Sequence, residues 1–142
     1  FKQQKDLYKY ARKLANARNC KLYSINTNFE DKFLDVDKYF YNATPYDFVN
    51  LVKNAQEVVT NSFHGLSFSI IYNKPVHQFK KNGTENSRMV DLLNELDLSE
   101  RLVISEELLT NQLNYDITET IIAKNKTKSI EFLQKGLMCN DR

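Results

Sequence analysis

The residues with the clearest potential for chemistry lie together between positions 60 and 65. Thr60, Asn61 and Ser62 carry hydrogen-bonding side chains, His64 carries an imidazole, and Gly65 lets the backbone approach a ligand closely. An imidazole titrates near neutral pH, so His64 could donate to a phosphate or carry a proton. The block predicts a site for a small anion, in which His64 is the catalytic candidate and Thr60, Asn61, Ser62 and Gly65 contact substrate.

The segments on either side of this block predict where it lies in the fold. A short apolar run, Val58–Thr60, precedes it, and a longer apolar segment, Leu66–Tyr72, follows. This pattern is typical of a buried parallel strand that turns sharply into a helix. Open α/β sheets bind ligands at the carboxyl edge, where the free amides and the dipole of a helix N-terminus favour anions. We therefore expect an anion site at this edge of a sheet.

Each residue of the block also has a plain structural explanation. His64 could hydrogen-bond to nearby backbone at the helix terminus. The side chains of Thr60, Asn61 and Ser62 could cap the following helix instead of binding a ligand. Tight packing of a strand against a helix explains Gly65 as well as a phosphate does.

Three features of the sequence outside the block have residue types that could belong to a site. Arg88, at the start of a later helix, is a candidate substrate-binding cation, and a solvated or salt-bridged arginine is its alternative. His77 lies inside a predicted strand, which favours a structural role. The acidic pair Asp35 and Asp37 is similar to a metal-binding motif, but it lies in a segment without a pattern, so we assign it no metal.

Helices and strands alternate along the chain and predict an α/β fold. Apolar periodicity predicts helices over residues 3–18, 45–55 and 66–72, another from residue 87, and a long C-terminal helix from residue 116, with strands over residues 20–25, 57–60 and 76–79. Thr44, Pro45 and Asp47 have the spacing of a capped helix start. Residues 27–43 have no clear period and are assigned to a loop. We expect a Rossmann-like three-layer domain with a mostly parallel sheet and helices on both faces.

Composition excludes several classes of protein. The 142 residues carry 20 basic and 18 acidic side chains, a net charge of +2 that gives no reason to expect a nucleic acid partner. No apolar stretch approaches the roughly 20 residues that a membrane-spanning helix needs. Two cysteines far apart, Cys20 and Cys139, fit a reducing compartment, although one long-range disulfide stays open. We expect a cytoplasmic protein, either free or peripheral to the inner face of the membrane.

A longer stretch around the histidine is similar to a known family signature. Residues 58–75, VVTNSFHGLSFSIIYNKP, resemble the signature of the polysaccharide pyruvyl transferase family, and the segments 45–55 and 87–101 resemble its flanking helices. The resemblance implies two Rossmann-like halves of the GT-B type. Residues 1–142 would then be a single domain, the C-terminal, donor-side half of a longer two-domain transferase.

The resemblance also implies an activity. The better-studied members transfer the enolpyruvyl unit of phosphoenolpyruvate to two sugar hydroxyls, which forms a pyruvate ketal and releases phosphate. Phosphoenolpyruvate would be the donor substrate, with no cofactor. The acceptor would be a saccharide, free or lipid-linked, in the biosynthesis of a surface exopolysaccharide. We expect the isolated domain to be inactive without its missing N-terminal half, because a cleft between two domains needs both walls.

This chain departs from the family pattern at one position that matters for the donor. The better-studied members carry an arginine two residues before the histidine, where this chain has Ser62. Another cation, such as Arg88 or one from the N-terminal half, would have to neutralise the ligand. Two alternatives stay open: a GT-B-type glycosyltransferase whose pocket holds a nucleotide sugar, and a non-catalytic interaction module that kept the fold and lost the chemistry.

Overall fold

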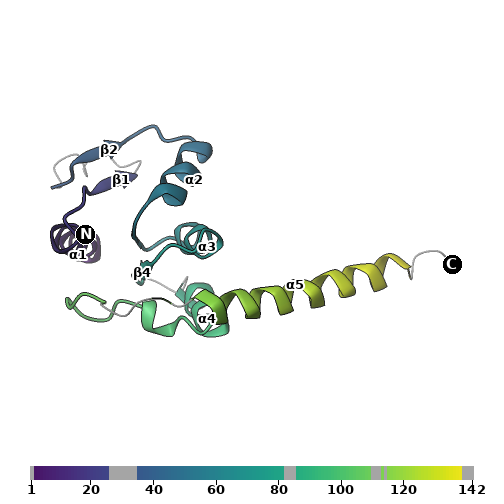
Figure 1. Cartoon of the computed structure of the whole chain (residues 1–142). Helices are drawn as coiled ribbons and strands as arrows, with labels where there is room; N and C mark the ends of the chain where they lie inside the picture. Colours follow the sequence, from purple (N-terminus) through teal and green to yellow (C-terminus); the bar gives the residue numbers. More distant parts are fainter. Residues whose placement is uncertain (1, 26–34, 82–85, 110–112, 114, 139–142) are drawn as a thin grey trace.

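The computed structural model describes residues 2–25, 35–81, 86–109, 113 and 115–138. This part of the chain contains the helices α1 (Lys2–Ala17), α2 (Pro45–Asn54), α3 (Phe63–Ile71), α4 (Ser87–Glu95) and α5 (Tyr115–Met138), a 3-10 turn η3 (Ser99–Arg101), and the strands β1 (Tyr23–Ile25), β2 (Lys38–Phe40), β3 (Val58–Thr60) and β4 (Val76–Gln78) (Figure 1). Residues 27–34 of the predicted loop 27–43, and Cys139, lie outside the described residues.

Helices and parallel strands alternate, which confirms the α/β class. β1 pairs with β2 and β3 pairs with β4, both in parallel, with Ser24 opposite Tyr39 and Val59 opposite His77. The parallel pairing of the strands on either side of α3 agrees with the predicted, mostly parallel sheet. The described strands form two separate two-stranded sheets rather than the single sheet that we expected.

The strand β2 shows where the sequence prediction was wrong. Lys38–Phe40 falls in the segment assigned to a loop, because three residues are too few for a period to be seen. Its neighbour β1 decides the conformation: the carbonyl of Leu22 accepts from the amides of Asp37 and Lys38, and the Asp37 carboxylate accepts from the Leu22 amide at 2.7 Å. This amide and the Arg12 guanidinium lower the pKa of Asp37. Arg12 pairs with both Asp35 and Asp37.

The start of α2 confirms the predicted cap. The amide of Asp47 donates to the Thr44 hydroxyl, and the Asp47 carboxylate accepts from the Thr44 amide at 2.9 Å, with Pro45 in the first turn. These are the two reciprocal bonds of a capping box, so local chemistry alone fixes this boundary. At α4 the cap lies one residue earlier than expected, at Asn86 instead of Ser87.

Two apolar clusters hold the helices to the strands. The larger one joins α3, β4 and α4 through buried aliphatic side chains, among them Leu66, Ile70, Val76, Leu93 and Leu98. The smaller one joins α1 to the strand region through Tyr10, Leu14 and Val103. α5 is the predicted long C-terminal helix, and it extends away from the other helices (Figure 1). None of the described helices combines the length and apolar content needed to cross a bilayer.

Candidate functional site

The predicted turn between β3 and α3 is built around a very close contact. A Cβ atom placed on Gly65 would lie 2.3 Å from the Thr60 hydroxyl oxygen and 3.0 Å from the Thr60 Cβ. That same hydroxyl accepts from the Ser62 amide at 3.0 Å. Only a residue without a side chain lets α3 start this close to the end of β3. The packing explanation of Gly65 is thus present in the structure, and its contact with substrate stays a prediction.

The first turn of α3 presents free donors. Ser62 is the N-cap but makes no side-chain capping bond, so the alternative that its hydroxyl only caps the helix finds no support. The amide of Leu66 is the first to donate back along the helix, to the Ser62 carbonyl at 3.0 Å. The amides of Phe63, His64 and Gly65 precede it at the positive end of the helix dipole. This end of α3 can therefore accept an anion.

Four of the predicted residues lie on one cavity. A cavity of about 740 Å³ opens between α1, β1, α2 and β3, and Thr60, Asn61, Ser62 and Gly65 are among its lining residues. We call it the inter-sheet cavity, because β1 and β3 belong to different sheets. The four residues sit where β3 ends, which is the carboxyl edge at which the sequence predicted them.

The other two predicted residues lie outside this cavity. His64 is exposed, and its ring stands 6.3 Å from the ring of Phe63. Arg88, at the start of α4, places its guanidinium 5.7 Å from the centroid of the same Phe63 ring. Neither His64 nor Arg88 is among the described residues that line the inter-sheet cavity. The structure thus divides the predicted site into a cavity side and an outer side, joined by the first turn of α3.

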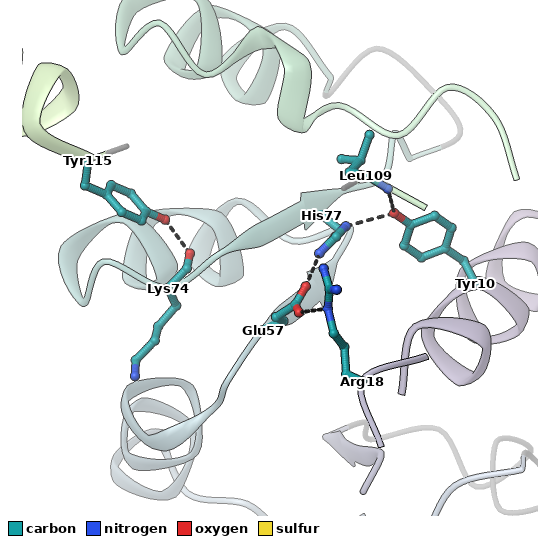
Figure 2. A network of polar contacts seen from close by, with 7 residues as sticks. All are labelled: Tyr10, Arg18, Glu57, Lys74, His77, Leu109 and Tyr115. Atoms are coloured by element: carbon teal, nitrogen blue, oxygen red, sulfur yellow. Dashed lines mark hydrogen bonds and ion pairs between the residues drawn. The ribbon is translucent and has the colours of Figure 1, made fainter. Parts of the chain in front are cut away.

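A buried polar network borders the same cavity (Figure 2). Nε2 of His77 lies 2.7 Å from the Glu57 carboxylate, and Nδ1 lies 2.8 Å from the Tyr10 hydroxyl. Tyr10 in turn accepts from the amide of Leu109, and Arg18 donates to Glu57 at 2.6 Å. The tautomer that satisfies every partner carries its proton on Nε2 and accepts from Tyr10 at Nδ1. His77 therefore has the structural role that its place in a strand predicted.

Burial sets the charge state of this network. Desolvation lowers the pKa of His77, although Glu57 opposes the shift. Desolvation alone would raise the pKa of Glu57, but hydrogen bonds from His77 and Arg18 outweigh it and the pKa is lowered. Both directions agree with a neutral imidazole that donates to an ionised carboxylate. Burial also raises the pKa of Tyr10.

Two residues of this network were missed in the sequence. Arg18 and Glu57 line the inter-sheet cavity, so an ion pair stands in its wall. The signal in the sequence is weak, namely a carboxylate directly before an apolar strand and an arginine directly after a helix. Within the described ranges, no group of three or more His, Cys, Asp or Glu side chains is placed to hold a metal ion.

Comparison with known families identifies the family of this chain. The family model for polysaccharide pyruvyl transferase matches residues 2–77, which is more than half of the 142 residues. This chain belongs to the polysaccharide pyruvyl transferase family. The match runs from α1 into β4 and so includes His64 and the four cavity-lining residues, whereas Arg88 lies beyond it. No curated protein and no solved structure shows a significant match to the chain.

Proposed function

We propose that this chain is the donor-side part of a pyruvyltransferase that moves pyruvyl from phosphoenolpyruvate to sugar hydroxyls of a surface polysaccharide or its precursor. Membership of the family supports the reaction class. The observation that carries the donor site is the open amino terminus of α3, which adjoins the inter-sheet cavity and has Arg88 close by. The rest of the cleft would come from an N-terminal half of the enzyme.

The donor fits this site by charge. Phosphoenolpyruvate carries a phosphate and a carboxylate, so a pocket for it needs cations and oriented N–H donors. The amides of Phe63, His64 and Gly65 provide the donors, and the hydroxyl of Ser62 adds another polar group at the same turn. Arg88 is the nearby cation that replaces the arginine absent at position 62.

The chemistry requires one proton to be delivered and phosphate to leave. Protonation of the methylene carbon gives cationic character at the carbon that bears the phosphate, and an acceptor hydroxyl attacks that carbon and loses its proton. Departure of phosphate lets a second hydroxyl of the sugar attack the same carbon, and loss of the proton of this hydroxyl to the released phosphate completes the ketal. His64 supplies the proton or hydrogen-bonds the departing phosphate, because it lies on the turn whose amides face the anion.

Binding of the donor tests the first half of this proposal. Titration calorimetry of the full-length enzyme should show binding of phosphoenolpyruvate, and Arg88→Ala should weaken it about tenfold or more, as expected for a lost charge-assisted hydrogen bond. Lys124→Ala is the control, since it removes a cation from an exposed position on α5. No heat with phosphoenolpyruvate together with clear binding of a nucleotide sugar would replace the proposal by the glycosyltransferase alternative.

Turnover tests the role of His64. His64→Ala in the full-length enzyme should lower kcat by about 10²- to 10⁴-fold, the usual contribution of a positioned acid or base. Since the ring is exposed, the substitution should leave the denaturation midpoint close to that of the parent enzyme. Unchanged turnover in a folded variant would limit His64 to a structural role. Absence of any turnover in the parent enzyme, with saccharide binding retained, would favour a non-catalytic module.

A further inference from the structure

The inter-sheet cavity separates two parallel sheets that share one covering helix. The Tyr8 hydroxyl of α1 lies 2.8 Å from the Ser24 hydroxyl in β1, and the Tyr10 hydroxyl lies 2.8 Å from His77 in β4. Val59 of β3 packs against the same apolar cluster as Tyr10. One helix thus rests on residues of both sheets, so the two sheets present the same side to α1.

Within the described part of the chain, the strand edges that face each other across the cavity have backbone groups that pair with no other strand. In β3 the amide of Val58 donates to Pro75, and the carbonyl of Thr60 accepts from Phe79, both toward β4. Backbone groups alternate between the two edges of a parallel strand, so those of Val59 point away from β4. By the same alternation, Leu22 bonds β2 and the groups of Tyr23 and Ile25 point away from it.

The two remaining walls of the cavity are helices with apolar side chains. From α1 the lining residues include Leu7, Ala11 and Leu14, and from α2 they include Phe48, Leu51 and Val52. A pair of open strand edges with an apolar helix on either face is the environment of an internal strand in a doubly wound sheet. Each unpaired backbone N–H and C=O group in such a place needs a hydrogen-bond partner, and an internal strand supplies partners to both edges.

We propose that a β-strand which leads directly into α1 in the intact protein occupies the inter-sheet cavity and pairs in parallel with β1 and β3. Such a strand, α1 and β1 form a βαβ unit, in which the crossover helix covers the sheet as α1 does. The paired strand satisfies the backbone groups of Val59 on one edge and those of Tyr23 and Ile25 on the other. It joins the two small sheets into one.

The strand order that results supports the choice of occupant. The order becomes β2, β1, inserted strand, β3, β4, and Leu102 extends it by a parallel bridge to Gln78. In chain order, the sheet grows from the inserted strand first to one side, through β1 and β2, and then to the other side, through β3 and β4. This is the doubly wound order. The point of reversal lies between the inserted strand and β3. The turn from Asn61 to Gly65 stands at the carboxyl edge there, where such sheets bind ligands.

The walls also define the chemistry of the occupant. Because α1 lies on one face and α2 on the other, the strand is buried on both faces, and its sequence is a nearly continuous run of β-branched and aliphatic residues. About five or six residues without proline suffice, the usual length of a strand. The inference depends on backbone geometry and not on which anion binds at α3.

Amide hydrogen exchange tests the proposal on two extended chains. One carries the strand Val-Ile-Val-Thr-Ile-Val and a Gly-Asn linker before residue 1, and the control has proline at the third strand position. The strand should slow exchange of the amides of Val59, Tyr23 and Ile25 at least tenfold relative to the control. The amide of Val58 is an internal reference, because it already bonds Pro75, and it should slow less. Equal exchange in both chains would overturn the proposal.

A cross-link gives a second test that does not depend on the designed strand alone. The native thiols are removed through Cys20→Ser and Cys139→Ser. The test places one thiol on each of the two facing strands, through Ser24→Cys in β1 and Val59→Cys in β3. With a strand between them, these residues are separated by about twice the 4.8 Å strand spacing, too far for a disulfide. A disulfide after mild oxidation would show that β1 and β3 pair directly, and would overturn the proposal. So would protection that appears only in a dimer, since a second copy would then fill the cavity.

Discussion

At the scale of single residues, the contact between Gly65 and Thr60 is the tightest constraint at the site. The missing side chain lets α3 begin next to the end of β3, and this brings the free amides of the helix to the cavity. The same residue therefore serves packing, and its role in substrate binding stays a prediction. Sequence alone could not distinguish tight packing from approach of an anion as the reason for Gly65, because both require glycine and neither predicts a different neighbouring residue.

Substitution of Gly65 should be costly in stability. Gly65→Ala forces its Cβ to within 2.3 Å of the Thr60 hydroxyl, so β3 and α3 must move apart, and we expect a loss of about 1–3 kcal/mol. Urea denaturation measures it. Gly136→Ala is the matched control: nothing lies within 4 Å of its added Cβ, and helix propensity predicts a gain of up to about 1 kcal/mol. Equal midpoints for the Gly65 variant and the parent chain would contradict the described geometry.

At the scale of elements, the His77 network ties α1 to β4 and to the segment before β3. Desolvation lowers the pKa of His77 below its ordinary value of about 6.5. Between these two values the unfolded chain binds a proton that the folded chain does not, so stability falls as the pH drops below about 6.5. The lowered pKa of Glu57 has the same sign and acts at lower pH.

Stability measured against pH should therefore depend on His77. Urea unfolding between pH 7.5 and 5.0 should show a slope of up to about 1.4 kcal/mol per pH unit for the single proton taken up at His77. His77→Gln should flatten this slope and lower stability at pH 7.5, because Glu57 and Tyr10 lose a buried partner. His64→Gln replaces the only other histidine of the chain and serves as control. Parallel curves for the parent chain and the His77 variant would refute this assignment.

Elements with local signals were predicted well, and those that depend on partners were not. The cap of α2 follows from Thr44 and Asp47 and needs nothing outside the helix. β2 has three residues, and its conformation depends on hydrogen bonds with β1, so no local pattern marks it. α3 begins at Phe63, three residues before the predicted start at residue 66, and the close approach of Gly65 to Thr60 at this start is a contact that hydrophobic periodicity does not record.

At the scale of the whole molecule, the sequence predicted the class of the fold and the place of one turn in it. Alternation of short apolar runs with helices predicted the α/β class and the position of the β3–α3 turn at a sheet edge, because both are recorded in hydrophobic periodicity. His64 and Arg88 lie outside the cavity, beside Phe63. Their position depends on the orientation of the helices, which hydrophobic periodicity does not encode. The ion pair of Arg18 and Glu57 was missed because its partners are 39 positions apart.

The bond between Tyr10 and His77 has a consequence for how the chain reaches this structure. It joins residues 67 positions apart, whereas the Leu22–Asp37 bond that ties β1 to β2 spans only 15. From the logarithmic dependence of closure entropy on loop length, the longer closure costs about 1.3 kcal/mol more. Each parallel pair can therefore assemble from its own neighbourhood first, and the docking of α1 onto β4 comes late in folding.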